Sequence, residues 1–535
     1  MMNRFLFIIF LSYIFSNVHN NHRCNFSDSS FFHIVRSRPD LDTSILSPTG
    51  HFKIHYDTIG VDAPVMDDTN DNNIPDYIEE VGIIADSSRK VIVDIMGFYS
   101  EPDDDDGIYD IYIEDRGSGS YGFNAIDNQQ TGSSYIVIDD EYEESDYYIP
   151  GLNTMRLTVA HEFFHAVQRA YRIYPNTSGY FYEMSSTWIE DVIVPDGNDY
   201  IFWVDNFFNN PDQDIDDTNG YSIALYGHYL TQVIEQEPNQ MSSSIIREIW
   251  EYFQNVNNAH VSIDNILNSY ESSFSETWVD FCTRNLFNGR FPDMNNNIYY
   301  YSDQIITSPI QTSPSILNQD QYIEDVIINN KSISPLISYD SNDFFILNHN
   351  SSLPTSNYFG QIVIDRYNNN VDIYEIDNDI SYNINKNDKI HLVYSSYNNP
   401  NTQLMDIDIL LENCDINDPP EGFCDCSGNI LDECGICAGS NECFPSKVDI
   451  NKIYPNPSFD NIINIQYEIP RRTNVLIILY DSNGKLINTI TNEIQDGREA
   501  PYIISYNAEK LSSGIYLVNL IAENVSISKW VTLIK

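Results

Sequence analysis

Two histidines and a glutamate fall within five residues of the chain, in the segment His161-Glu162-Phe163-Phe164-His165. On a helix, residues four apart project from one face, so both imidazoles could bind a single tetrahedral Zn²⁺. Glu162 lies one position on, where its carboxylate could hold a water molecule and accept its proton once Zn²⁺ has lowered the pKa of that water. The spacing predicts a zinc site with Glu162 as general base.

A catalytic zinc site needs a third protein ligand and a fourth position left for water. Glu183 follows His165 by 18 residues and opens a helical pattern that continues to Asp191. A second helix packed beside the first could deliver this carboxylate to the metal. Glu190, two turns later on the same face, is the alternative ligand, although we favour for it a hydrogen bond that orients a ligating histidine.

Hydrolysis of an amide also requires a donor for the negative charge that develops on the carbonyl oxygen. Tyr221, Tyr226 and His228 lie together in a third helical segment, Tyr221 to Glu235. Each is also compatible with an ordinary place in an aromatic core. Among the three we favour Tyr221.

A second cation site is predicted upstream, where Asp68 to Glu79 has the spacing of a twelve-residue calcium loop. The expected ligands are Asp68, Asn70, Asn72, the Ile74 carbonyl, Asp76 and Glu79. Asn73 occupies the turn position that is usually glycine, and asparagine tolerates the left-handed conformation needed there. The acidic run Asp103 to Asp106 is better explained as an exposed loop.

The elements that must position these residues follow an α+β order. Strands are expected at His51–Asp57, Ile108–Ile113 and Tyr135–Asp139, and helices at Asp76–Phe98, Leu152–Tyr171 and Phe181–Val194. Short alternating segments from about residue 299 predict β-sandwich structure. The expected order is a signal peptide at 1–20, a candidate pro-segment at 21–50, a catalytic domain at 51–298, a β-sandwich domain at 299–412, a cysteine-rich module at 413–446 and a last β domain at 447–535.

Composition limits the possible partners. The 535 residues carry a formal net charge of −52, which argues against nucleic acid or an anionic membrane as a partner. Residues 447–535 contain nine basic and nine acidic residues, so the whole excess lies before them and the last domain differs in origin.

The N-terminus has the features of a secretory signal peptide, with Arg4 before the apolar run Phe5–Phe15. No later stretch is long and apolar enough to predict a transmembrane helix. Six of the eight cysteines lie between Cys414 and Cys443, and an exported chain favours three disulfides there over zinc, with 15 pairings open.

Two resemblances bear on these expectations. Residues His51 to Ile298, through the HEFFH helix and the segment Glu183-x-x-Ser-x-Trp-x-Glu-Asp, resemble a bacterial family of secreted metallopeptidases of the gluzincin type. This resemblance implies a zincin-like α+β fold, with zinc held by His161, His165 and Glu183 and with Glu162 as base.

The C-terminal segment, with Ile453-Tyr-Pro-Asn-Pro457, the turn Ser482-Asn-Gly484 and the end Lys529–Lys535, resembles the type IX secretion sorting domain. That resemblance implies an immunoglobulin-like sandwich and the type IX secretion machinery as a partner. It also implies export across the outer membrane, followed by release or attachment at the cell surface.

Together these features predict a secreted zinc endopeptidase that acts on protein or peptide substrates and also binds calcium. The alternative is a calcium-dependent surface-binding protein whose zinc site is structural or inactive. A zinc hydrolase acting on something other than peptides is a third reading. The presence of Glu162 favours catalysis, because metal binding alone does not require it.

Overall fold

The structure is a computed structural model. It describes residues 37–117, 120–142, 147–173, 178–290, 298–378, 380–397, 402–413, 424, 431, 437, 447–459, 461–498 and 500–535. The chain divides into two compact units, one of residues 1–340, 349–380 and 389–409, the other of residues 341–348, 381–388 and 410–535. The predicted signal peptide and most of the cysteine-rich module lie outside the described residues.

The first unit contains a five-stranded sheet of order β1-β2-β3-β5-β4. Its strands are β1 (Thr43–Leu46), β2 (Phe52–Tyr56), β3 (Tyr109–Glu114), β4 (Gly122–Ile126) and β5 (Ser134–Asp139). The inner strands β2, β3 and β5 run parallel, and β1 and β4 are antiparallel edges. Every residue of β5 is buried, as expected for a strand covered on both faces.

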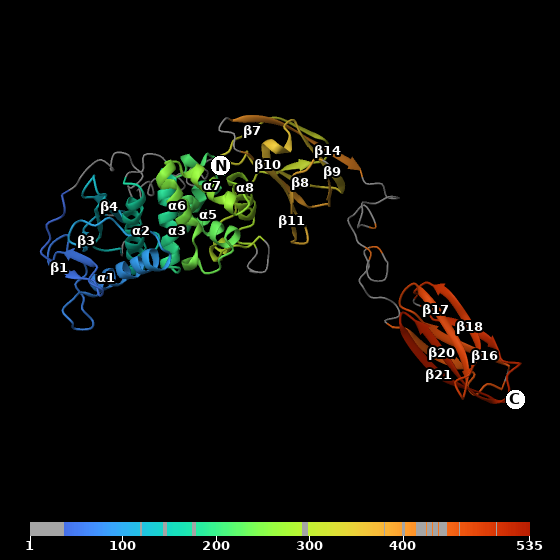
Figure 1. The fold of residues 1–535 in the computed structure, drawn as a ribbon. Helices are drawn as coiled ribbons and strands as arrows, with labels where there is room; N and C mark the ends of the chain where they lie inside the picture. The colour runs from blue at the N-terminus through green and yellow to red at the C-terminus, as the bar shows by residue number, and fades with distance from the viewer. Residues whose placement is uncertain are drawn as a thin grey trace, which may run out of the picture. The chain divides into compact units, whose positions relative to one another are not determined.

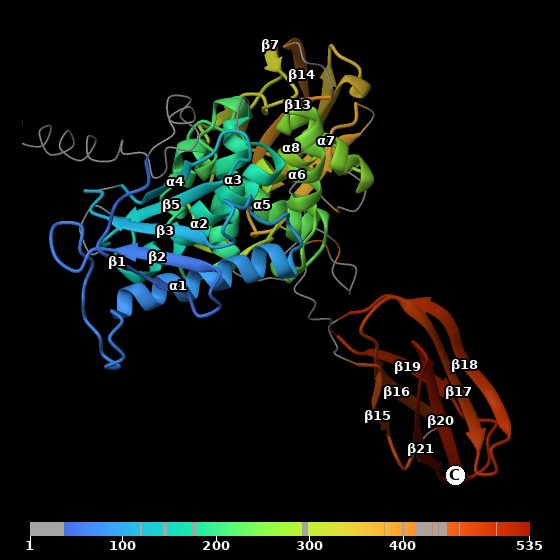
Figure 2. The same cartoon turned by 60° about the vertical axis from the view of Figure 1, so that its left-hand side comes forward.

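All but the first of the helices follow the sheet in the chain, and the first lies between β2 and β3. They are α1 (Asp76–Arg89), α2 (Leu152–Tyr171), α3 (Gly179–Ile193), α4 (Ile201–Phe208), α5 (Ala224–Tyr229), α6 (Ile245–Val256), α7 (Ala259–Ser269) and α8 (Phe274–Asn285). Helix α2 contacts β4 and β5 on one side and α3 on the other, so it lies between the sheet and the remaining helices (Figures 1 and 2). No helix in the described ranges has the length and apolar character that crossing a bilayer demands.

The predicted helix bearing the histidine pair is confirmed at Leu152–Tyr171. Two other predictions need correction, because neither segment is one regular α-helix. Residues 221–235 form a 3-10 turn, α5 and a π-helical turn, and residues 76–98 form α1 followed by a π-helical turn at Lys90–Ile95. Gly97, with a φ of 77°, ends the latter segment in a conformation that glycine adopts readily.

Two strands were not predicted. β4 lies between two of the predicted strands, and its five residues are all buried, so it lacks the alternation that marks a half-exposed strand. β1 pairs with β2 and lies within the candidate pro-segment. The sheet therefore starts before residue 51.

β-Structure predominates among the described residues after α8, as predicted. One sheet has the order β11-β10-β13-β8-β6 and another β12-β9-β14-β7. Their strands are β6 (Ser315–Leu317), β7 (Gln321–Ile328), β8 (Ile337–Ser341), β9 (Phe345–Ser351), β10 (Tyr358–Asp365), β11 (Val371–Glu375), β12 (Ser381–Ile384), β13 (Lys389–Ser396) and β14 (Gln403–Asn413). Tyr300, Ile310, Ile333 and Val393 belong to the same buried core as the helices, so the first unit has a continuous interior.

The C-terminal region has two antiparallel sheets around its own core, an arrangement compatible with a β-sandwich. The sheets have the orders β15-β16-β19 and β18-β17-β20-β21. Their strands are β15 (Asp449–Tyr454), β16 (Ile462–Glu468), β17 (Thr473–Asp481), β18 (Leu486–Gln495), β19 (Tyr502–Asn507), β20 (Gly514–Ala522) and β21 (Val525–Leu533).

The close approach of α2 to the sheet depends on Gly122 in β4. A Cβ atom at this position would lie 2.8 Å from Thr158 Cγ2 of α2 and 2.8 Å from the Val137 carbonyl oxygen. We expect Gly122→Ala to lower the free energy of unfolding by about 2 kcal/mol, because overpacking forces the helix and strand apart. Urea denaturation of the full-length chain measures this change.

The companion variant is Gly122→Ala combined with Thr158→Ser, which removes the Thr158 methyl group but keeps its hydroxyl. Part of the lost stability should return, since the contact with the Val137 carbonyl remains. Wild-type stability in the Gly122→Ala variant would contradict the packing described here.

Candidate metal centre

His161 and His165 lie one turn apart on the buried face of α2. Their side chains are 4% and 0% exposed, and their rings stand edge to face with centroids 4.5 Å apart. Their Nε2 atoms approach the same carboxylate oxygen, Glu183 Oε2, at 3.2 and 3.4 Å. Two imidazoles and one carboxylate thus present three ligand atoms that all lie within 4.8 Å of one another.

The Nδ1 atom of each histidine, on the side of the ring away from Glu183, is within hydrogen-bond distance of another side chain. Glu190 Oε1 lies 2.5 Å from His161 Nδ1, and Gln168 Oε1 lies 2.8 Å from His165 Nδ1. A proton on Nδ1 satisfies both contacts and leaves a lone pair on Nε2, the form of imidazole that binds a metal. The structure therefore places Glu183 on the ligand side of the histidines and Glu190 on the far side.

Gln168 is itself fixed, which determines how its amide faces His165. Its Nε2 donates to the Tyr182 carbonyl at 3.0 Å and to Ser186 Oγ at 2.9 Å, so its Oε1 remains the acceptor. Both of these partners lie on α3. Groups on α3 therefore orient Gln168, and Gln168 in turn orients His165, a candidate ligand on α2. Residues that hydrogen-bond to metal ligands commonly have this role.

Charge in the cluster is balanced internally. Burial alone lowers the pKa of His161, but the carboxylates of Glu190 and Glu183 outweigh it and raise that pKa to about 10. Burial alone raises the pKa of Glu183, but the His165 and His161 imidazoles outweigh it and lower that pKa to about 2. A bound dication would balance the charge of these carboxylates in place of the extra proton on the imidazole.

The donor set fits zinc, which favours four-coordinate sites of nitrogen and carboxylate ligands. Glu183 Oε1 supports this fit, because it is buried and accepts no hydrogen bond from the described residues. A buried carboxylate oxygen without a donor is costly unless a cation completes it. His161, His165 and Glu183 are thus the residues that could hold the metal.

Glu162 and the three oxyanion candidates occupy different surroundings. Glu162 is 1% exposed and follows His161 on α2. The Tyr221 ring stacks on the His161 ring at a centroid distance of 5.8 Å, whereas Tyr226 bonds Thr277 Oγ1 at 2.8 Å and His228 Nδ1 contacts Gln240 Oε1 at 2.7 Å.

Sequence reasoning missed Gln168, Ser186 and Gly220. Gln168 lies three residues after His165 on the same helix, a spacing that brings two side chains together and could have identified it. Ser186 and Gly220 lie close to the cluster of His161, His165 and Glu183 only because of the tertiary packing. Nothing in their local sequence indicates this role.

The predicted calcium loop curls so that side chains from its two ends meet. The Asn70 and Asn72 amides donate to Glu79 Oε2 and Oε1 at 2.8 and 2.5 Å. Asp68 Oδ1 and Oδ2 accept the backbone N–H groups of Asn72 and Asn73. Asn73 has a φ of 67°, the left-handed conformation expected from the sequence.

The two remaining candidates of this loop are also placed. Asp76 begins α1 and accepts the Thr69 N–H at 3.1 Å. The Ile74 N–H donates to Asn72 Oδ1 at 2.8 Å. Calcium in the loop stays a prediction.

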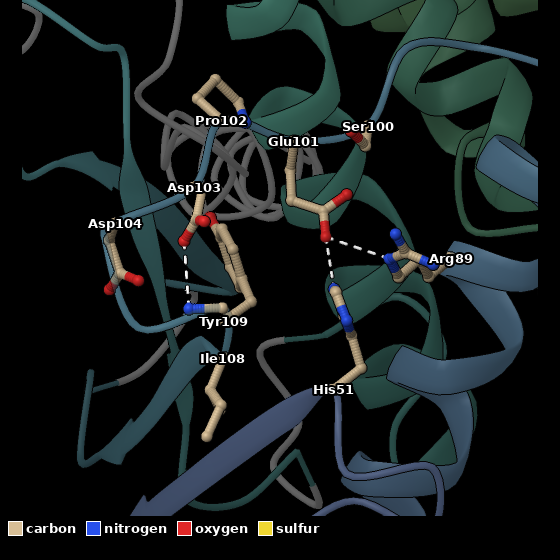
Figure 3. Close-up of a pocket in the computed structure, with 10 residues that line it drawn as sticks. His51, Arg89, Ser100, Glu101, Pro102, Asp103, Asp104, Ile108 and Tyr109 are labelled. Carbon is tan, nitrogen blue, oxygen red and sulfur yellow. Dashed lines mark hydrogen bonds and ion pairs between the residues drawn. The ribbon is translucent and has the colours of Figure 1, made fainter.

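A separate cavity of about 180 Å³ lies near the end of α1, and its lining includes no residue of the zinc candidate site (Figure 3). Glu101 projects into it between His51 and Arg89, as the dashed lines show. Its Oε1 contacts His51 Nε2 and accepts from Arg89 Nε at 3.0 Å. Burial alone raises the pKa of Glu101, but the bond with His51 and the charge of Arg89 outweigh it and lower that pKa.

Comparison with known proteins identifies the C-terminal region. Residues 452–534 match the family model described as the secretion system C-terminal sorting domain. The type IX secretion machinery is therefore a partner of this chain, which is exported across the outer membrane and then secreted or attached to the cell surface. One disulfide, Cys424–Cys437, is described within the cysteine-rich module.

The comparison with curated proteins gave no match. Among solved structures, a β-1,2-glucanase from Parabacteroides distasonis overlaps at 8% identity, covering 40% of this chain and 28% of its own, with a TM-score of 0.12. The extracellular region of zebrafish Gpr126 gives 9% identity, 41% and 31% coverage and a TM-score of 0.14. The chain spans less than a third of either structure, and TM-scores this low establish no common fold.

Gly220 determines how closely the chain can pass the candidate ligand Glu183. Its φ is 80°, and a Cβ atom there would lie 2.5 Å from Glu183 Cβ and 2.5 Å from the Tyr180 carbonyl oxygen. We expect Gly220→Ala to cost about 3 kcal/mol or more in unfolding free energy, from left-handed strain together with overpacking. Displacement of Glu183 should also weaken zinc binding, which metal titration would measure.

Gly50→Ala is the matched control, because Gly50 has a φ of 78° and no atom within 4 Å of its Cβ position. This variant carries the same backbone strain, about 1–2 kcal/mol, without the contact with Glu183. Equal effects of the two substitutions would show that the clash at Glu183 is unimportant.

The Glu101 contacts predict a pH-dependent contribution to stability. A lowered folded-state pKa stabilises the fold above the unfolded pKa of about 4.3, and this stabilisation is lost as pH falls through the folded pKa. Glu101→Gln should therefore cost about 1–3 kcal/mol at neutral pH. The gap to wild type should narrow below about pH 4 in denaturation measured across pH.

Asp94→Asn serves as the control, since Asp94 lies 3.9 Å from the same Arg89 but its side chain is 44% exposed. Exposed ion pairs contribute about 0–1 kcal/mol. A Glu101→Gln effect that does not change with pH would contradict the charge-based explanation.

Proposed function

We propose that this exported chain is a zinc-dependent endopeptidase. The observation that carries the proposal is the meeting of His161 Nε2, His165 Nε2 and Glu183 Oε2 between α2 and α3, with both Nδ1 atoms held from behind. A purely structural site would not require a further carboxylate beside the ligands, and Glu162 is such a carboxylate. Export to the cell exterior also suits an enzyme that degrades proteins there.

Zinc bound at this centre would act as a Lewis acid that polarises the peptide carbonyl and acidifies water. The chain's own residues account for the remaining steps. Glu162 accepts the proton of the attacking water and delivers it to the departing amine. Glu190 and Gln168 keep the two imidazoles in the orientation that leaves Nε2 for the metal.

Tyr221 is the residue best placed to stabilise the developing oxyanion. Its ring lies against His161 and also contacts the Trp203 ring at a centroid distance of 5.5 Å. A phenol hydroxyl near the scissile carbonyl can donate a hydrogen bond that strengthens as negative charge develops.

Replacing the proposed base should separate metal binding from catalysis. We expect the full-length wild-type chain to bind one Zn²⁺ at this centre and to cleave a broad protein mixture, with activity abolished by a zinc chelator. Glu162→Gln should retain zinc, because Glu162 is not a ligand, while kcat/KM falls about 10²–10⁴-fold. Metal analysis by mass spectrometry and fragment analysis measure the two properties.

Two further variants complete the test. Glu183→Gln should lose zinc together with activity, whereas Glu324→Gln, an exposed glutamate of β7, should match wild type. Zinc binding without cleavage of any protein would favour the calcium-dependent surface-binding alternative. A wild-type chain that takes up no zinc would refute the proposal.

A further inference from the structure

Three segments of the first unit enclose the cavity near the end of α1. Arg89 is the last residue of α1, His51 directly precedes β2, and the rest of the lining lies in residues 100–109, which lead into β3. The cavity volume of about 180 Å³ is smaller than the range of about 300–1,000 Å³ that is typical of sites for drug-sized ligands. A ligand of this cavity must therefore be small.

Glu101 presents an incompletely bonded carboxylate to this cavity. Its side chain is 6% exposed and projects inward from the loop before β3 (Figure 3). Its Oε1 is already engaged, because His51 Nε2 contacts it and Arg89 Nε donates to it at 3.0 Å. Its Oε2 is buried, and no other group in the described part of the chain donates to it. A buried carboxylate oxygen without a donor is costly, so this atom calls for a donor from outside the chain.

The charge of the lining favours a cation. Two further carboxylates, Asp103 and Asp104, line the same cavity. Arg38 Nη2 lies 2.5 Å from Asp104 Oδ2, but the same guanidinium also pairs with two other carboxylates. The Asp103 carboxylate is exposed, and its Oδ1 accepts the backbone N–H groups of Asp105 and Gly107 at 3.0 and 3.1 Å. Negative charge in the walls therefore exceeds positive charge, which attracts cations and repels anions.

The geometry of the cavity selects among cations. Within the described ranges, no three ligand atoms of its His, Asp and Glu residues lie within 4.8 Å of one another, so it lacks the donor set of a metal site. A guanidinium fork matches both oxygens of a carboxylate, whereas only one oxygen of Glu101 remains without a partner. A primary ammonium group is compact and can direct one of its three N–H donors at a single oxygen.

We propose that this cavity binds a small primary amine in its ammonium form. One N–H of the ligand donates to Glu101 Oε2, which completes the hydrogen bonding of that carboxylate. Pro102, Ile108 and Tyr109 supply apolar surface in the same lining, so a short alkyl chain can be buried beside the charged group. The small volume limits the ligand to a few non-hydrogen atoms.

The bound amine would reinforce contacts that already join the three segments. Glu101 links His51, at the start of β2, to Arg89, at the end of α1. A charge-assisted hydrogen bond to the second oxygen of Glu101 would hold this carboxylate in its present orientation. The lining includes no residue of the zinc candidate site, so the proposal does not depend on zinc or on peptidase activity.

Titration of the full-length chain with n-propylammonium chloride tests the site. At constant ionic strength, saturation-transfer NMR should show saturable binding with a Kd of about 1 mM, which is within the limit for so small a ligand. Tetramethylammonium carries the same charge but has no N–H, so it measures the general attraction of a chain with a net charge of −52. We expect it to bind at least tenfold more weakly, because it cannot donate to Glu101 Oε2.

Substitutions then assign the binding to the cavity. Glu101→Gln should weaken propylammonium binding about tenfold or more, because a charge-assisted hydrogen bond is lost. Asp103→Asn, at an exposed position of the lining, should weaken it about two- to fivefold. Asp94→Asn is the matched control and should keep the wild-type affinity, since Asp94 lies near the same Arg89 but outside the lining. Circular dichroism verifies that each variant is folded.

Several results would overturn the proposal. These are an absence of saturable propylammonium binding, equal affinities for propylammonium and tetramethylammonium, or wild-type affinity in a folded Glu101→Gln chain. If Glu101→Gln does not fold, wild-type affinity in Asp103→Asn has the same meaning. Zinc content and peptide cleavage do not enter this test, so failure of the enzyme proposal would leave its outcome unaffected.

Discussion

The contact between α2 and α3 encloses ionisable groups that are almost completely buried, and the surrounding structure depends on this pairing. The side chains of His161, His165, Glu183 and Glu190 are each no more than 4% exposed. Charges buried in this way are tolerated only when paired and hydrogen-bonded. Sliding α3 by one turn along α2 would separate every carboxylate from its imidazole, so the electrostatics fix the register of the two helices.

Aromatic packing holds this register from outside. The Trp250 ring of α6 stacks on Phe181 and meets Tyr182 edge to face, and its Nε1 donates to Ser185 Oγ at 3.2 Å. Further along α3, Gly227 of α5 leaves room for the Trp188 ring, since a Cβ atom at Gly227 would lie 2.8 Å from that ring. Large, rigid side chains thus fix the position of α3, and they thereby also fix the position of Glu183.

The sequence predicted the parts of the centre that local pattern determines. The four-residue interval between His161 and His165 was enough to predict that α2 carries both imidazoles on one face, and a second helical pattern was enough to predict the helix that carries Glu183. The turn chemistry of Asn73 was likewise predicted, because a left-handed asparagine is a local preference. Gly220 was beyond such reasoning, since its role comes from a contact with a residue far away in the chain.

The errors in the fold prediction have a similar origin. β4 is buried on both faces, so its sequence carries no alternation, and only its pairing with β5 makes it a strand. The segment after Tyr221 is helical as expected, yet it passes through 3-10, α and π geometry within 14 residues. Local propensity favours a helix there, whereas packing against α3 determines which kind.

The proposed zinc centre and the predicted calcium loop differ in chemistry and in access, and these differences are linked. The buried nitrogen donors of the proposed centre suit zinc, because imidazole binds a borderline-soft ion directly. The oxygen donors of the loop Asp68–Glu79, with Asn70 and Asn72 exposed, suit an ion that keeps water ligands and exchanges with its surroundings. An ion in the loop would therefore depend on the surrounding solution, whereas the α2–α3 centre is set by the fold itself.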